Sequence, residues 1–184
     1  MTGPAEHLVT AEELYANHDH ERYELVRGAL RVCEPPGGIH GRLAARITSR
    51  LQAHVEQHGL GTVLVEAGYV LQRNPDTVRG PDISFISATR MAPDQIPAQY
   101  IPGSPDLAIE ILSPNDRWHE VEEKVADYLG SGARMVWVVD PRRRCVIVRY
   151  PDRAPRVAGE NEALDGEDVV PGFRCAVGEV FGSG

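Results

Sequence analysis

The chain has 184 residues, 42% of them apolar, which is long enough for one domain with a single hydrophobic core. Its formal net charge of −8 argues against a protein that binds nucleic acid through a broad basic surface, because such binding depends on neutralising phosphates with Lys and Arg. No stretch approaches the roughly 18 consecutive apolar residues of a membrane helix, so we expect a cytoplasmic protein with no membrane partner.

The N-terminal part predicts a short helix and a hairpin. Thr10 and Glu13 have the spacing of a capping box, which indicates a helix over 10–17. Residues 23–27 and 29–33 are rich in strand-forming side chains and flank a glycine, so they predict a β-hairpin.

A longer helix follows over 39–58. Its apolar residues recur every four positions, which is typical of an amphipathic helix. Gly59 is a natural end for it. The apolar positions are Ile39, Leu43, Ile47, Leu51 and Val55.

The middle of the chain alternates strands with turns. We expect β-structure over 61–72, a turn over 74–80, a short strand over 81–86 and a long Pro-rich loop over 93–105. A loop of that length is often functional.

The next elements complete the core. Residues 107–112 are nearly all apolar apart from Glu110, as expected for a strand covered on both faces. A helix over 119–129 and strands over 135–139 and 145–150 follow. This order predicts an α/β fold with a central mixed sheet flanked by helices. We expect one domain over 1–184, with its core at about 22–150 and a C-terminal extension at 151–184.

Two carboxylates stand where burial would be costly unless they share a cation. Asp82 falls in a short predicted strand and Glu110 in an apolar one. Mg²⁺ is bound by one or two carboxylates, so the pair is a candidate metal site. The alternative is structural: Asp82 would cap a turn, and Glu110 would pair with an arginine in the core.

The order of these motifs resembles the PD-(D/E)XK superfamily of restriction-endonuclease-like proteins. It is most similar to the Uma-type family of small restriction endonucleases known chiefly from genome sequences. The resemblance covers about three quarters of the chain. The matching motifs are Tyr23-Glu24-Leu25-Val26 with Gly28, His40, Pro81-Asp82, Glu110-Ile111-Leu112-Ser113-Pro114, Glu123-Lys124, Tyr128 and Trp137-Val138-Val139-Asp140-Pro141.

The resemblance implies a restriction-endonuclease-like core and a metal-dependent endonuclease acting on DNA. It implies that Asp82, Glu110 and the backbone carbonyl of Ile111 hold Mg²⁺ or Mn²⁺, with Lys124 orienting the attacking water or stabilising charge. The sequence departs from the superfamily at Leu112, where the motif lysine should stand. Lys124 has to substitute from the following helix.

Lys124 is the single lysine among the 19 basic residues, and the others are arginines. A surface ion pair with Glu120, four residues before it, is the structural alternative. An arginine would serve that pair equally well, which favours a functional lysine.

Four further residues are candidates for the site. Glu24 is either a third acid in the cleft or a solvated strand residue. His40, at a helix start, either supports the site near a phosphate or is a surface histidine. Arg42 and Arg46, on one flank of the long helix, either contact the substrate backbone or form a solvated helix face.

Two other functions remain open. The chain could be a catalytically inactive binding or partner module of the same fold, for which Leu112 is the supporting feature. It could also be a metal-dependent hydrolase of a smaller phosphate ester, which suits the acidic charge. A homodimer is compatible with each of these functions.

Overall fold

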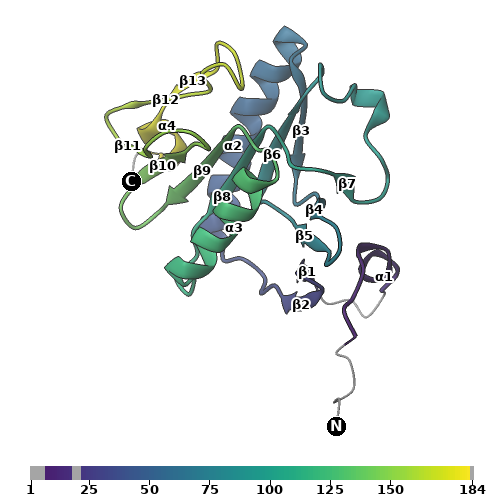
Figure 1. The fold of residues 1–184 in the computed structure, drawn as a ribbon. Helices are drawn as coiled ribbons and strands as arrows, with labels where there is room; N and C mark the ends of the chain where they lie inside the picture. The colour runs from purple at the N-terminus through teal and green to yellow at the C-terminus, as the bar shows by residue number, and fades with distance from the viewer. Residues whose placement is uncertain (1–6, 18–21, 183–184) are drawn as a thin grey trace.

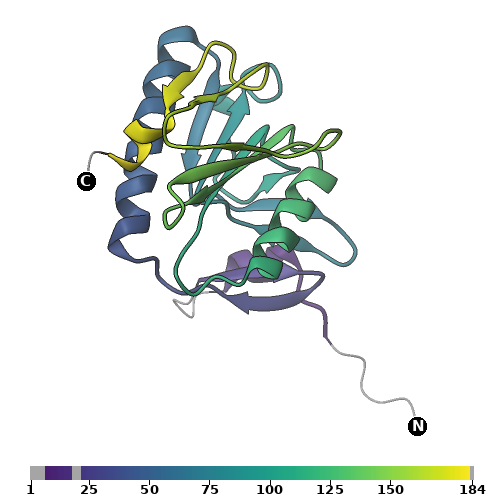
Figure 2. The same ribbon diagram turned by 90° about the vertical axis from the view of Figure 1, so that its left-hand side faces the viewer.

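The computed structural model describes residues 7–17 and 22–182. Their strands form a six-stranded sheet, a five-stranded sheet and a two-stranded hairpin, and helices lie on both faces of the largest sheet (Figures 1 and 2). This arrangement confirms the predicted α/β class with a central mixed sheet. Within the described ranges, no helix is long and apolar enough to cross a membrane.

The six-stranded sheet is the centre of the fold, with its strands in the order β11-β10-β9-β8-β6-β3. β8 and β9 run parallel, and the other neighbours are antiparallel. β8 and β9 are buried along their whole length because helices cover both faces. The strands are β3 (Gly61–Val65), β6 (Ile83–Ser87), β8 (Leu107–Ile111), β9 (Met135–Asp140), β10 (Cys145–Arg149) and β11 (Arg156–Ala158).

Helix α2 (Gly38–His58) covers one face of this sheet (Figure 2). Ile39 is 61% exposed, so the predicted apolar stripe is wrong at its first position and begins one turn later. Gly59 ends the helix at a φ of 61°, a left-handed conformation that glycine adopts without steric cost. The buried residues of the stripe are Leu43, Ile47, Leu51 and Val55.

Helix α3 (Trp118–Gly130) covers the opposite face. Val121, Val125 and Tyr128 turn toward the sheet and pack against Ala108 of β8 and residues of β9. The helix therefore presents one face to the sheet residues that flank Glu110.

The five-stranded sheet lies below the central sheet in Figure 2 and contacts α3 through Glu24 and Arg79. Its order is β2-β1-β5-β4-β7, and β1 with β2 forms the predicted hairpin. Helix α1 (Ala11–Ala16) packs on this sheet, and both halves of its predicted capping box are present. The strands are β1 (Tyr23–Val26), β2 (Ala29–Val32), β4 (Tyr69–Gln72), β5 (Thr77–Arg79) and β7 (Ile101–Pro102).

The chain beyond residue 150 packs back onto α2 and the central sheet. Leu164, Phe173 and Phe181 are buried in the same core as the apolar stripe of α2. The expected C-terminal extension thus supplies part of the core itself. Its elements after β11 are β12 (Ala163–Asp165), β13 (Arg174–Ala176) and α4 (Val177–Phe181), and η1 (Pro93–Gln95) is a short 3₁₀ turn in the Pro-rich loop.

Two local predictions near the site were wrong. The expected turn over 74–80 contains β5, a three-residue strand that is buried between β1 and β4. It pairs with β4, the strand just before it in the chain, and with β1, which is distant in sequence, so local patterns indicate only part of its pairing. Asp82 was expected inside a strand, but it stands immediately before β6.

Candidate active site

Asp82 occupies the turn between the two sheets, just before β6. Its Oδ2 accepts a hydrogen bond of 2.6 Å from the backbone N–H of Ile111 and lies 3.0 Å from Nε2 of His40. In the part of the chain that the structure describes, no hydrogen bond reaches the other oxygen, Oδ1. The antiparallel pair Ile83 and Ile109 puts Asp82 opposite Glu110 when the register is extended by one residue.

Glu110 points from β8 toward α3 and is 7% exposed. Its Oε1 accepts a 2.8 Å hydrogen bond from the Tyr128 hydroxyl, and its Oε2 lies 3.3 Å from Nζ of Lys124. Burial raises the pKa of Glu110 to about 7, with help from the negative charges of Asp82 and Glu24 and against the opposing charge of Lys124. The Glu110 carboxylate therefore lies in a buried region where the nearby carboxylates make negative charge unfavourable.

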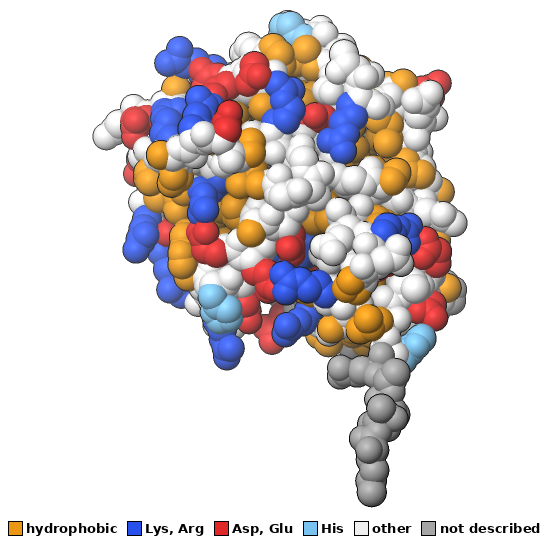
Figure 3. All heavy atoms as spheres, in the orientation of Figure 1, with side chains coloured by type: hydrophobic (Ala, Val, Ile, Leu, Met, Phe, Trp, Pro, Cys, Tyr) orange, Lys and Arg blue, Asp and Glu red, His pale blue; other side chains and the backbone are white. Residues whose placement is uncertain are grey.

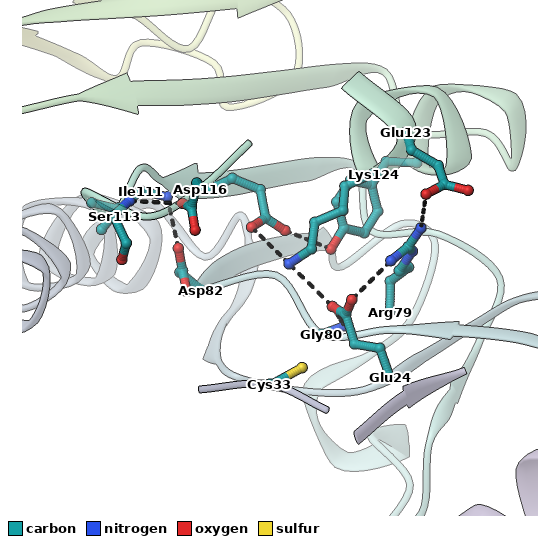
Figure 4. Close-up of polar contacts among 12 residues, drawn as sticks. Glu24, Cys33, Arg79, Gly80, Asp82, Ile111, Ser113, Asp116, Glu123 and Lys124 are labelled. Atoms are coloured by element: carbon teal, nitrogen blue, oxygen red, sulfur yellow. Dashed lines mark hydrogen bonds and ion pairs between the residues drawn. The ribbon is translucent and has the colours of Figure 1, made fainter. Parts of the chain in front are cut away.

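Lys124 turns inward from α3 (Figure 4). Its Nζ lies 3.3 Å from Oε2 of Glu110 and 3.2 Å from Oε1 of Glu24. Burial opposes protonation, but Glu110, Glu24 and Asp82 together raise the pKa of Lys124 above its ordinary value, so the ammonium stays charged. The surface alternative is not observed, since among the described residues no ion pair joins Lys124 to Glu120.

Glu24 is buried on β1 and belongs to the same cluster, so the alternative of a solvated strand residue is wrong. Its Oε1 accepts from Lys124 and from the backbone N–H of Gly80, and its Oε2 lies 2.9 Å from Nη1 of Arg79. Burial would raise the pKa of Glu24, but the charges of Lys124 and Arg79 outweigh it and lower that pKa. Both Glu24 oxygens contact a cation or an amide, so in this structure Glu24 supports Lys124.

His40 lies in the first turn of α2 and is 8% exposed, which excludes the surface alternative. Its contact with Asp82 raises its pKa, against the effect of burial, and the charges of Glu110 and Asp116 act in the same direction. The other ring nitrogen, Nδ1, is buried without a hydrogen-bond partner among the described residues. His40 thus orients Asp82 from the side opposite α3.

Among the described contacts, neither Arg42 nor Arg46 is joined to this cluster by a hydrogen bond or ion pair. Arg42 is exposed, and no hydrogen bond or ion pair holds it among the described residues. Arg46 is half-buried, with Nη1 3.5 Å from the carbonyl oxygen of Val180 in α4. Arg46 would have to leave α4 before it could contact a phosphate.

Two hollows adjoin the cluster. A groove of about 720 Å³ starts at His40 and Asp82 and follows the exposed side of α2 to Glu56. A smaller cavity of about 90 Å³ lies on the other side of β8. The cavity is lined by Glu110, Ile111, Leu112, Asp116, Glu120, Val121 and Lys124. The cluster is therefore open to water or a small ligand from two directions.

Charged side chains of both signs are interspersed on the face shown in Figure 3, with no broad basic area. This pattern agrees with the net charge of −8. A polyanion would have to be held by a few local contacts at the rim of the cluster.

Two residues of the cluster were not predicted from the sequence: Arg79 was not expected at the site, and no role there was predicted for Tyr128. Arg79 is 4% exposed and contacts three acids, and the Tyr128 hydroxyl is buried against Glu110. The position of Arg79, three residues before Asp82, was the only available signal for it.

The cluster places carboxylate oxygens, which are hard metal ligands, next to the positively charged ammonium of Lys124. Asp82, Glu110 and the backbone carbonyl of Ile111 are oxygen ligands of the type that Mg²⁺ and Mn²⁺ prefer. Within the described ranges, no group of three His, Cys, Asp or Glu side chains is arranged to hold a metal ion. A site of two carboxylates, one carbonyl, water and substrate oxygens does not require such a group.

The chain is an α/β protein with a buried cluster of acids around its one lysine. The structure is similar to the crystal structure of a putative nuclease belonging to DUF820 from Anabaena variabilis ATCC 29413, with a TM-score of 0.83. The two chains are 21% identical, and the match covers 94% of this chain and 97% of the other. A comparison with curated proteins returns no match.

The chain belongs to the Uma2 family, which is described as "Putative restriction endonuclease" and whose model matches residues 8–178. This result confirms the resemblance to the Uma-type family found in the sequence, and the structural match shows that the mixed α/β fold is shared with the Anabaena variabilis protein.

Proposed function

We propose that this chain is an Mg²⁺- or Mn²⁺-dependent endonuclease that hydrolyses phosphodiester bonds of DNA. The observation that carries the proposal is the cluster of Asp82, Glu110 and Lys124, in which Nζ of Lys124 lies 3.3 Å from Oε2 of Glu110. Membership of the Uma2 family, described as "Putative restriction endonuclease", supports the reaction class.

The donors in the cluster fit a divalent cation. Asp82 has one oxygen without a hydrogen bond among the described residues, and Glu110 has a pKa raised to about 7 by burial and neighbouring anions. Positive charge at this point would relieve that excess of negative charge. Asp82, Glu110 and the carbonyl of Ile111 would hold the ion, which when bound polarises the scissile phosphate and lowers the pKa of a bound water.

The protein's own residues do the positioning. Glu110 and Glu24 hold the Lys124 ammonium as a fixed positive charge, which can orient a water molecule or stabilise charge on a phosphate oxygen. Tyr128 orients Glu110 from α3, and His40 orients Asp82 from α2. The groups are thus arranged before substrate arrives, which lowers the reorganisation that the reaction requires.

DNA contacts in this proposal are local. Of the two candidates Arg42 and Arg46, Arg42 is the better one, because it is exposed and held by no other residue of the described chain. Arg46 contributes only after releasing Val180.

Cleavage of supercoiled plasmid with Mg²⁺, Mn²⁺ or EDTA tests the proposal. We expect cleavage with either metal, none with EDTA, and none in Asp82→Asn or Glu110→Gln. A matched control is Asp168→Asn, which removes a carboxylate that pairs with Arg134 on the surface and should cleave normally. Cleavage that persists in EDTA, or in both site variants, would overturn the assignment.

Two further measurements distinguish the nuclease from the two other functions. Leu112, in place of the motif lysine, favours an inactive binding module, and such a module would show no Mn²⁺ binding that depends on Asp82 and Glu110 in calorimetry. Single-stranded DNA, RNA and nucleotides should be tested beside the plasmid. Hydrolysis of nucleotides alone would identify a phosphate-ester hydrolase.

A further inference from the structure

Arg79 is a buried arginine beside the proposed site. It stands at the end of β5 with 4% of its surface exposed. Its Nη1 lies 2.9 Å from Oε2 of Glu24, and its Nε and Nη2 donate to Oδ2 of Asp127 at 2.9 and 2.7 Å. Figure 4 shows Arg79 between Glu24 and Glu123, whose Oε2 lies 3.8 Å from Nη2. Arg79 therefore joins the N-terminal hairpin to helix α3.

The contact between Arg79 and Glu24 determines how the Glu24 carboxylate is presented. Arg79 holds one oxygen, Oε2, and the other oxygen, Oε1, faces Nζ of Lys124 at 3.2 Å. The backbone N–H of Gly80, the residue after Arg79, donates to the same Oε1. Two neighbouring residues of one chain segment thus fix the Glu24 carboxylate in its orientation toward Lys124.

Charge balance makes this contact important for Lys124. The ammonium lies between Glu24 and Glu110, both almost fully buried. If Arg79 were neutral, Lys124 would be the one cation in contact with Glu24 among the described residues. Lys124 would then be drawn toward Glu24, or Glu24 would become protonated and release Lys124. Either change moves Nζ relative to Glu110.

We propose that Arg79 is a positioning residue for Lys124: by fixing Glu24, it keeps the Lys124 ammonium beside Glu110. Its catalytic consequence rests on the proposed nuclease function, whereas the position of Lys124 can be measured independently of any activity. Arg79 makes no hydrogen bond or ion pair with Asp82 or Glu110 among the described contacts, so any effect of Arg79 on the metal site must pass through Lys124.

The single lysine of the chain makes the first test selective. In protein labelled with ¹⁵N-lysine, the buried and paired Lys124 ammonium should give one observable Nζ–H signal. Arg79→Gln should shift or broaden that signal. Arg149→Gln is the matched control, because Arg149 pairs with Glu122 on the same helix without touching Lys124, and it should leave the signal unchanged. An unchanged signal in Arg79→Gln would overturn the proposal.

Kinetics provide the second test. Arg79→Gln should lower kcat for plasmid cleavage on the order of tenfold to a hundredfold, with KM changed less than about twofold, because a buried residue does not touch DNA. Mn²⁺ affinity in calorimetry should change less than in Asp82→Asn or Glu110→Gln, which remove the proposed ligands themselves. Arg79→Lys should recover part of kcat, since it restores the charge without the second hydrogen bond to Asp127. A variant with normal kcat contradicts the inference.

A double-mutant cycle shows whether Arg79 acts through Glu24. Arg79→Gln combined with Glu24→Gln should have the same Nζ–H signal and kcat as Glu24→Gln alone. Additive effects would mean that Arg79 acts by another route. If Arg79→Gln does not unfold cooperatively, the Nζ–H signal of Lys124 in Glu24→Gln provides the test. An unchanged signal in that variant would refute the proposal. If the wild-type chain shows no cleavage, the proposed function fails while the Nζ–H measurement still tests Arg79.

Discussion

Lys124 and Glu110 are 14 residues apart in the chain, yet Nζ of Lys124 lies 3.3 Å from Oε2 of Glu110. The link between β8 and α3 turns the chain back, so that a helix residue reaches the strand carboxylate. The motif position for this lysine, Leu112, is half-buried against the residues beneath α3. The charge is thus supplied from a second element.

Lys124→Ala should reduce metal-dependent cleavage about a hundredfold or more, because removing one charge-stabilising group has an effect of that order. Lys124→Arg should also be poor, since the planar guanidinium cannot occupy the same point-charge position. Plasmid cleavage rates and circular dichroism of each variant provide the measurement. A well-folded Lys124→Ala that cleaves at the wild-type rate would exclude a catalytic lysine.

Returning the lysine to the motif position should rescue the defect. Leu112 and Lys124 line the same cavity as Glu110, so the ammonium of Leu112→Lys can reach that carboxylate. In a Lys124→Ala background, Leu112→Lys should raise the cleavage rate about tenfold, a part of what one such group contributes. Leu112→Met in the same background is the control for side-chain bulk and should not raise the rate.

Tyr128→Phe should make metal binding more sensitive to acid. The hydroxyl of Tyr128 donates to Glu110 and lowers its pKa against the larger effect of burial, so removing the hydroxyl raises that pKa further. Glu110 must be ionised to bind a cation, so Mn²⁺ affinity should fall more at pH 6 than at pH 8. Calorimetric titration at both pH values checks this. Equal losses at the two pH values would show that Tyr128 acts only through packing.

Glu110 should make the metal-free protein less stable as pH rises. The pKa of Glu110 in the folded state is raised from 4.5 to about 7, so between these values the folded state binds more protons than the unfolded state. Its contribution to stability is therefore present below about pH 4.5 and is lost as pH rises to about 7. The free energy of unfolding of wild type relative to Glu110→Gln should fall by up to about 3 kcal/mol across that range.

Urea unfolding in EDTA at pH 5 and pH 7 measures this difference. Added Mn²⁺ should stabilise wild type at pH 7 and leave Glu110→Gln nearly unchanged, because a ligand stabilises the state that binds it. A difference between the two proteins that does not vary with pH would show that Glu110 has an ordinary pKa.

Local sequence patterns determined most of the elements and the acids of the site. The four-residue spacing of apolar residues located α2, and the capping box located α1. A run that is apolar except for Glu110 located β8. Each of these signals depends on residues that are neighbours in the chain, and their periodicity directly reflects helix or strand geometry. The ordered motifs also identified the family correctly.

The tertiary structure alone decided which charges meet. Arg79, Glu24 and Lys124 come from β5, β1 and α3, and β5 meets β1 only through a pairing between segments that are distant in sequence. The partners of Lys124 could not be predicted from the sequence either. Helical spacing indicated an ion pair with Glu120, but in the folded chain Lys124 contacts Glu24 and Glu110. The pairing of buried charges depends on distances across the core, and burial strengthens each contact by excluding water. Such distances are set by the packing of whole elements, which no local pattern contains.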